Sequence, residues 1–109
     1  MTVESQELMI SEELNLGQEI AETVIPGNGK KIYIEEFYGS AAFTSNSVVR
    51  IVWDYGGNDE ILWSIKGEGQ MPFKINRTGD GSKKFALVCE NGELGKLFMS
   101  AYAVVIVEV

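Results

Sequence analysis

The C-terminal run of this chain, residues 97–109, is hydrophobic on both of its alternating sets of positions. The odd positions are all hydrophobic. The hydrophobic even positions are Phe98, Tyr102, Val104 and Ile106. A half-exposed strand would alternate apolar with polar side chains, so this pattern predicts a strand that is covered on both faces. One face fits the core of the domain, and the other face needs a partner.

Length and composition indicate one small domain that lacks the residue types of the common zinc and nucleophile sites. The 109 residues are 45% hydrophobic, which is enough for one core. The chain has no histidine, and its single cysteine, Cys89, has no partner for an internal disulfide. The common zinc and nucleophile sites are therefore not available. We predict a non-enzymatic protein without cofactor or metal, in which Cys89 is a small buried hydrophobe.

The charge of the chain argues against polyanionic partners. Nine Lys and Arg residues against 16 Asp and Glu residues give a net charge of −7, which opposes binding to nucleic acid and to anionic lipid. Residues 1–11 show no charged-then-apolar leader, and residues 97–107 are too few and too β-branched for a spanning helix. We expect synthesis in the cytoplasm without a signal peptide, and no nucleic acid or membrane partner.

From Gly17 onward, runs rich in Val, Ile, Phe, Tyr and Trp alternate with clusters of Gly, Asn, Asp and Ser. The spacing of these runs is typical of an all-β sandwich or barrel. The predicted strands are Glu19–Ile25, Lys31–Tyr38, Ser47–Tyr55, Glu60–Lys66, Met71–Arg77, Lys83–Glu90 and Leu97–Glu108. We therefore predict an antiparallel, jelly-roll-like β-sandwich of about seven or eight strands over residues 17–109.

Turn residues predict two local hairpins. Ser47–Tyr55 is expected to pair with Glu60–Lys66 across a Gly-Gly-Asn loop, and Met71–Arg77 with Lys83–Glu90 across a Gly-Asp-Gly loop. The inward face of the first hairpin is predicted to hold Val49, Ile51, Trp53 and Tyr55 opposite Ile61, Trp63 and Ile65. Because both tryptophans share a phase with isoleucines, core packing is favoured over an exposed aromatic platform.

The N-terminal segment, residues 1–16, fits no single period. Its apolar residues leave three alternatives open: a strand around Leu8–Ile10, a frayed helix, or an extended arm that crosses onto a neighbouring subunit. We treat it as an N-terminal arm or edge segment. Leu8, Met9 and Ile10 are predicted to anchor it.

The loop 54–60 places oxygen ligands around flexible glycines, which is what a hard cation such as calcium requires. Its weak candidate ligands are Asp54, Asn58 and Asp59. The spacing matches no EF-hand loop, so a solvated hairpin turn is the favoured interpretation.

Four packing and turn motifs carry a resemblance to a known group of proteins. They are Ile-x-x-Phe-x-Gly at 34–39, Ser-Val-Val-Arg-Ile-Val-Trp-Asp at 47–54, Ile-Leu-Trp-Ser at 61–64 and Asn-Gly-x-Leu-Gly at 91–95. In this spacing the chain resembles small jelly-roll structural proteins of tailed bacteriophages. The resemblance implies a virion component, either a capsid decoration or cement protein or a tail-associated subunit, which contacts other virion proteins and contributes no catalytic residues.

Assembly is the role that remains once chemistry is largely excluded. We predict a homo-oligomer, specifically a trimer. The alternation of residues 97–109 allows either the odd or the even set to line the core, and the even set, Phe98, Tyr102, Val104 and Ile106, is the predicted subunit interface. The alternative is a carbohydrate-binding β-sandwich module that uses Tyr38 and Tyr55 as sugar contacts.

Overall fold

The computed structural model describes residues 3–41, 47–66, 68–70, 77–92 and 95–108. Its strands are β1 (Val3–Leu14), β2 (Glu19–Val24), β3 (Lys31–Ala41), β4 (Val48–Trp53), β5 (Glu60–Lys66), β6 (Glu68–Gln70), β7 (Arg77–Thr78), β8 (Phe85–Glu90) and β9 (Leu97–Glu108). Six predicted strands coincide with observed strands to within about three residues at each end. The seventh, Met71–Arg77, lies outside the described residues except at Arg77.

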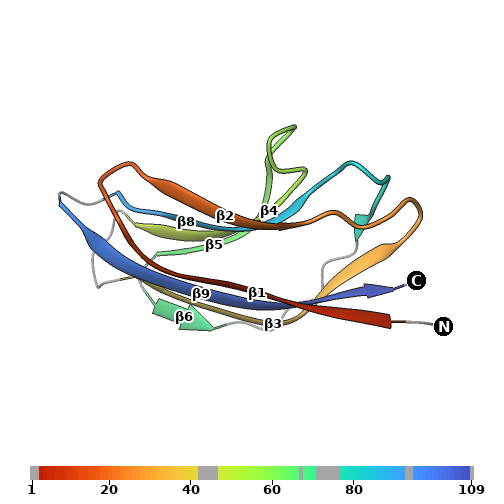
Figure 1. The fold of residues 1–109 in the computed structure, drawn as a ribbon, viewed down its shortest axis with the longest axis horizontal. Helices are drawn as coiled ribbons and strands as arrows, with labels where there is room; N and C mark the ends of the chain where they lie inside the picture. Colours follow the sequence, from red (N-terminus) through yellow and green to blue (C-terminus); the bar gives the residue numbers. More distant parts are fainter. Residues whose placement is uncertain (1–2, 42–46, 67, 71–76, 93–94, 109) are drawn as a thin grey trace.

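The strands form two antiparallel sheets that lie one above the other (Figure 1). Sheet A has the order β1-β9-β3-β6, with β7 also paired to β3, and sheet B has the order β2-β8-β4-β5. The chain crosses from one sheet to the other between β1, β2, β3 and β4, and again from β5 to β6, from β7 to β8 and from β8 to β9. This connectivity confirms the predicted jelly-roll-like β-sandwich.

The core lies between the two sheets and is built by one alternating set from each strand. In β9 the odd residues face inward, and Met99, Ala103 and Val105 are fully buried. They pack with inward residues of sheet B such as Phe85 and Leu87. Cys89 is fully buried in the same cluster, which confirms its predicted role as a small hydrophobe. Burial also raises the pKa of its thiol to about 12.

The N-terminal segment forms a strand of the sandwich. β1 pairs with β9 in an unbroken antiparallel register from Val3–Glu108 to Leu14–Leu97, so the strand is the alternative that the structure supports. Leu8 and Ile10 were predicted to anchor an arm on a partner, and their burial corrects that prediction. Both side chains point between the sheets and fill the core of their own chain, because even positions of β1 face inward.

The second predicted hairpin, Met71–Arg77 with Lys83–Glu90, is wrong at Arg77, where the structure describes its first strand. Arg77–Thr78 pairs with Lys31–Ile32 of β3, whereas β8 pairs with β2 and β4. The reason is a pair of backbone hydrogen bonds that continue this contact into the loops. The Gly79 N–H donates to the Lys30 carbonyl at 2.8 Å, and the Gly29 N–H donates to the Gly79 carbonyl at 2.9 Å. These partners hold the segment against sheet A.

The first predicted hairpin is confirmed, with one change of face. β4 pairs with β5, but the register shifts so that Ile51 lies opposite Trp63 while Val52 lies opposite Ile61. The additional residue, Leu62, is a β-bulge that reverses the alternation beyond it. Ile61, which was predicted to face inward, is therefore 57% exposed on the outer side of sheet B.

Candidate functional site: the outer face of sheet A

The even residues of β9 lie on the outer face of sheet A. Phe98 is 59% exposed, and Tyr102, Val104 and Ile106 are half-buried by their neighbours on the sheet. The alternation that places the odd residues in the core thus presents the predicted interface set to the outside. Their use as subunit contacts stays a prediction.

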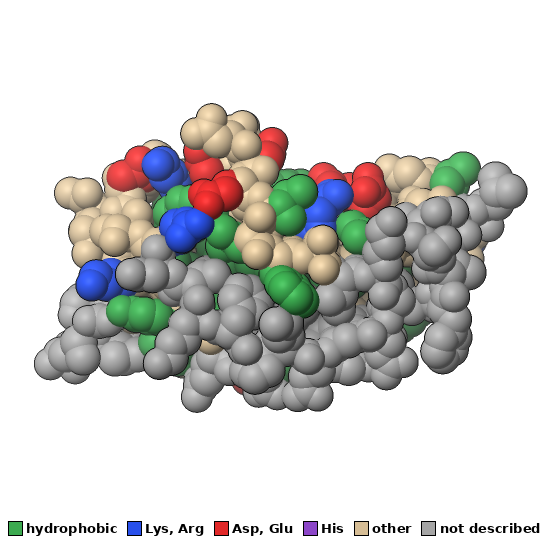
Figure 2. Space-filling view, turned by 180° about the vertical axis from the view of Figure 1, so that it is seen from behind, with side chains coloured by type: hydrophobic (Ala, Val, Ile, Leu, Met, Phe, Trp, Pro, Cys, Tyr) green, Lys and Arg blue, Asp and Glu red, His purple; other side chains and the backbone are tan. Residues whose placement is uncertain are grey.

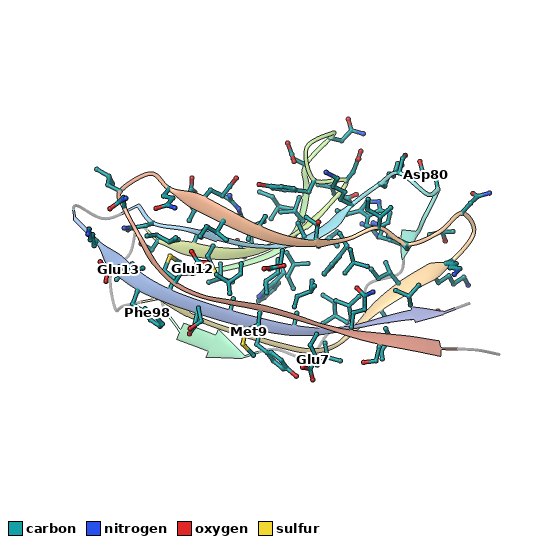
Figure 3. The ribbon with its side chains drawn as sticks, in the orientation of Figure 1. Glu7, Met9, Glu12, Glu13, Asp80 and Phe98 are labelled. Carbon is teal, nitrogen blue, oxygen red and sulfur yellow. The ribbon has the colours of Figure 1, made fainter. Side chains whose placement is uncertain are left out.

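The neighbouring strand β1 adds Met9 to this surface. Met9 lies opposite Tyr102 in the register of the two strands and is 60% exposed. We call the set Met9, Phe98, Tyr102, Val104 and Ile106 the outer stripe. Figure 3 shows Met9 and Phe98 pointing away from the sandwich on the outer side of the lower sheet.

Acidic residues border the outer stripe along β1. Glu7 lies opposite Val104, and Glu13 lies opposite Phe98. The Tyr102 hydroxyl donates a hydrogen bond of 3.2 Å to Glu7 Oε1, which orients the ring along the sheet. Lys96 Nζ lies 3.8 Å from Glu13 Oε1, an exposed pair that contributes little to stability. An apolar patch with a charged border is typical of a protein-binding surface.

The loop after β4 uses its acidic side chains to hold its own backbone. Asp59 Oδ1 accepts the Gly56 N–H at 2.7 Å, and Asp54 Oδ2 accepts the Asn58 N–H at 3.2 Å. Asp54 and Asp59 also adopt positive φ angles of 59° and 50°, which aspartate tolerates in turns. No group of three or more acidic or cysteine side chains that suits a metal occurs in the part of the chain that the structure describes.

A groove lies on the outer side of sheet B. It has a volume of about 400 Å³ and is lined by Glu19, Arg50, Val52, Tyr55, Gly56, Asp59 and Ile61. Arg50 forms ion pairs with Glu19 and with Glu90, the latter at 3.2 Å. The signal in the sequence for this site is a single arginine within the apolar strand Ser47–Tyr55, because a partly buried charge is commonly paired with carboxylates. Figure 2 shows acidic and basic side chains interspersed over this layer.

Tyr55, a predicted sugar contact, lies at this groove. Its hydroxyl donates a 2.9 Å hydrogen bond to Glu19 Oε2. Partial burial, and then this hydrogen bond and the charge of Glu19, raise the pKa of Tyr55 above its ordinary value. The side chain of Tyr38, the second predicted sugar contact, lies outside the described residues. Trp53 is buried in the core, as its phase predicts.

Asp80 organises the exposed turn before β8. Its Oδ1 accepts the Ser82 and Lys83 N–H groups, each at 2.8 Å, and the Ser82 hydroxyl at 2.9 Å. These donors favour the carboxylate and lower the pKa of Asp80 to about 2.

The lowered pKa predicts how this turn responds to acid. Because the pKa is lower in the folded chain, the ionised carboxylate stabilises the turn above pH 3.8, and this contribution is lost as the pH falls through about 2. A carbon-detected NMR titration of the Asp80 carboxyl should give a midpoint near 2, and Ser82→Ala should raise it. Ser11→Ala, on β1, should leave it unchanged. A wild-type midpoint near 3.8 would contradict these contacts.

Comparisons with known proteins bear on the fold alone. No protein-family model matches the chain, and the search of curated proteins finds no match. A periplasmic inhibitor of g-type lysozyme from Aeromonas hydrophila is similar in structure, with a TM-score of 0.52 and 15% identity over 92% of this chain and 85% of that one. A protein of the disulfide-linked pili of Bacillus endospore appendages has a TM-score of 0.53 and 12% identity over 99% and 88% of the two chains.

At 15% and 12% identity, the two structural likenesses support the same β-sandwich architecture and carry no residue-level correspondence.

No helix in the described ranges has the length and hydropathy needed to cross a membrane.

Proposed function

We propose that this chain is a non-enzymatic structural subunit that assembles with copies of itself through the outer stripe. The observation that carries this proposal is the solvent-exposed apolar surface of sheet A, on which Met9 and Phe98 are each about 60% exposed. Removing such side chains from water is worth about 25 cal/mol for each Å² buried, and most of the surface of these two residues is still exposed to water in the single chain.

The dimensions of this surface set its strength. Two strands of 12 residues, β1 and β9, span roughly 40 Å by 10 Å, or about 400 Å² on each copy. Two such faces bury about 800 Å² together, which is below the usual size of a specific interface. We therefore expect face-to-face contact to be weak alone and to act together with a second contact.

The comparison with the Bacillus pilus protein supports a subunit role without specifying it. Those pili are described as disulfide-linked. Cys89 is the single cysteine of this chain and is fully buried, so subunits of this sequence are held by non-covalent contacts. Reducing agents should accordingly leave the assembly intact.

The assembly that we propose is a phage-type virion, in which this subunit decorates or cements the capsid or attaches to the tail. The support is the resemblance of residues 34–39, 47–54, 61–64 and 91–95 to small phage jelly-roll proteins, together with the acidic, non-catalytic character of the chain. Capsid or tail genes beside its gene, and the protein itself in purified particles by mass spectrometry, are the expected results. Neighbouring genes of unrelated function would count against the virion.

The outer stripe is tested by Phe98→Asp. We expect this variant to keep its melting temperature, because Phe98 is exposed, and to lose self-association by at least tenfold in light scattering. The matched control is Ile61→Asp, which removes an almost equally exposed side chain from sheet B and should leave association unchanged. If Ile61→Asp disperses the assembly and Phe98→Asp does not, the interface lies on sheet B.

A second candidate is a carbohydrate-binding module, which the groove at Tyr55 favours. An aromatic ring beside Glu19, Arg50 and Asp59 offers the stacking surface and hydrogen-bonding groups that sugars need. Binding on a glycan array that is lost in Tyr55→Ala would establish this candidate. Wild-type protein that binds no glycan would remove it.

A further inference from the structure

One edge of sheet A is an open strand. β1 has one strand neighbour, β9, within the described part of the chain, and its other edge faces the viewer in Figure 1. The register with β9 runs over all 12 residues without a bulge. Of the devices that commonly protect an edge strand, Val3–Leu14 has no proline, lysine or bulge, and its four glutamates are the charges that restrict how a second strand can pair with it. A row of backbone N–H and C=O groups is therefore available for pairing.

We infer that a second copy of this chain pairs its own β1 with this edge, antiparallel, about a two-fold axis at Met9. The inference rests on the proposed self-assembly and names a second contact for it. A two-fold axis is the simplest way for one edge to serve both copies, because the same strand is then its own complement. The two A sheets become one continuous sheet.

The faces of the sheet restrict the register. Even residues of β1, such as Leu8 and Ile10, face the core, and odd residues, such as Met9, face outward. Opposed residues of an antiparallel pair lie on the same face, so even positions must meet even positions. A shift of one residue would turn the core-facing set of one copy to the outside of the other.

The glutamates then select among the registers that remain. With Met9 opposite Met9, residues 4–14 of each copy pair, and each glutamate is opposed by an uncharged residue. Glu7 is opposite Ser11, Glu12 is opposite Gln6, Glu13 is opposite Ser5, and Glu4 is opposite Leu14.

Neighbouring in-phase registers place like charges together. Centring the pair on Leu8 would set Glu4 against Glu12, and centring it on Ile10 would set Glu7 against Glu13. Directly opposed like charges destabilise a strand pair. Other in-phase registers also keep the glutamates apart. They pair only about two-thirds of β1 or less with the second copy. The Met9 pairing is therefore the longest one that the glutamates allow.

This arrangement also uses the exposed side chain at its centre. Met9 is 60% exposed in the single chain, and Figure 3 shows it on the outer side of β1 beside Glu7. At the two-fold axis the two Met9 side chains contact each other, and the outer stripes of the two copies join into one wider surface. Isologous pairing yields an even number of subunits, in contrast to the trimer expected from the sequence.

Cysteine cross-linking tests the register directly. In the Met9 pairing, residues 9 of the two copies have Cα atoms about 4.5–5.5 Å apart, which suits a disulfide. Two Ser11 residues lie four positions apart along the strands, about 13 Å, which is too far. We expect oxidised Met9→Cys to form at least tenfold more covalent dimer than Ser11→Cys on non-reducing gels. A mixture of Glu7→Cys and Ser11→Cys should form the mixed dimer, and wild-type protein, with Cys89 buried, should form none.

A second pair of variants supports the test if Met9→Cys misfolds. Ser11→Lys places a lysine opposite Glu7 twice in each dimer, and Ser11→Glu places a glutamate there. Their dissociation constants should differ by at least tenfold, with Ser11→Lys tighter. Equal constants, or equal cross-linking at residues 9 and 11, would overturn the pairing. Loss of association in Phe98→Asp together with these negative results would refute the edge pairing alone, whereas a wild-type monomer at high concentration would refute both proposals.

Discussion

A Met99→Asp variant is expected to be unfolded at 25 °C, while Phe98→Asp, one residue away, folds like the wild type. Met99 is fully buried between the sheets, and Phe98 is 59% exposed on the outer face. An aspartate at 99 loses the apolar packing of methionine, which is worth about 2–5 kcal/mol. It also leaves a carboxylate without a partner in the core, which costs several kcal/mol more. Together these terms approach the whole stability of a small domain, about 5–15 kcal/mol.

Far-ultraviolet circular dichroism and urea denaturation measure this difference. Met99→Leu is the matched control, because it keeps the volume and removes the charge, and it should cost less than about 1.5 kcal/mol. A folded Met99→Asp beside an unfolded Phe98→Asp would mean that the even set of β9 lines the core. That outcome would reverse the faces of the strand.

Replacement of Asn91 by leucine is expected to lower the free energy of unfolding by about 2–4 kcal/mol. A polar residue just after a strand is ordinarily exposed and tolerates substitution, but Asn91 is not exposed. Asn91 is fully buried, and its Nδ2 group donates to the Leu14 carbonyl at 2.8 Å and to the Gly95 carbonyl at 3.1 Å. Its Oδ1 accepts the Ser47 hydroxyl at 3.2 Å. The side chain thus joins the end of β1 to the loops before β4 and β9.

Leucine would leave these buried groups without partners, at about 1–3 kcal/mol for each unsatisfied group, partly offset by apolar packing. Asn91→Asp should be still more costly, because the carboxylate donates to neither carbonyl and buries a charge. The exposed Asn28 is the control, and Asn28→Leu should change the free energy of unfolding by less than about 0.5 kcal/mol. Urea denaturation measures the free energy of unfolding of the three variants. Equal values for Asn91→Leu and Asn28→Leu would show that the hydrogen bonds of the Asn91 side chain contribute nothing to stability.

The sequence predicted Asn91 only as part of a turn. Its neighbour Gly92 supports that interpretation, since Asn-Gly is a common turn dipeptide. The burial of Asn91 depends on Leu14 and Ser47, which lie 77 and 44 residues away along the chain. No local pattern reports partners at that separation, so the hydrogen-bond centre of this end of the sandwich could be found only in the structure.

Ile61 shows the same limit on a smaller scale. Strict alternation through Ile61, Trp63 and Ile65 predicts one inward face. The bulge at Leu62 breaks the alternation, because Trp63 lies opposite Ile51, which faces the core, whereas Ile61 lies opposite Val52, the next residue of β4. Ile61 therefore faces outward and lines the groove beside Tyr55.

The sequence by itself determined where most of the strands lie, that the sheets are antiparallel, and that the C-terminal run has two apolar faces. These properties follow from side-chain alternation and turn chemistry, which act over a few residues. Tertiary structure alone decided that the odd set of β9 faces the core, that Leu8 and Ile10 join it from β1, and that Phe98 and Met9 remain outside. A strand that is apolar on both faces fits a core in either orientation, and only the packing of a second sheet against one face makes the choice.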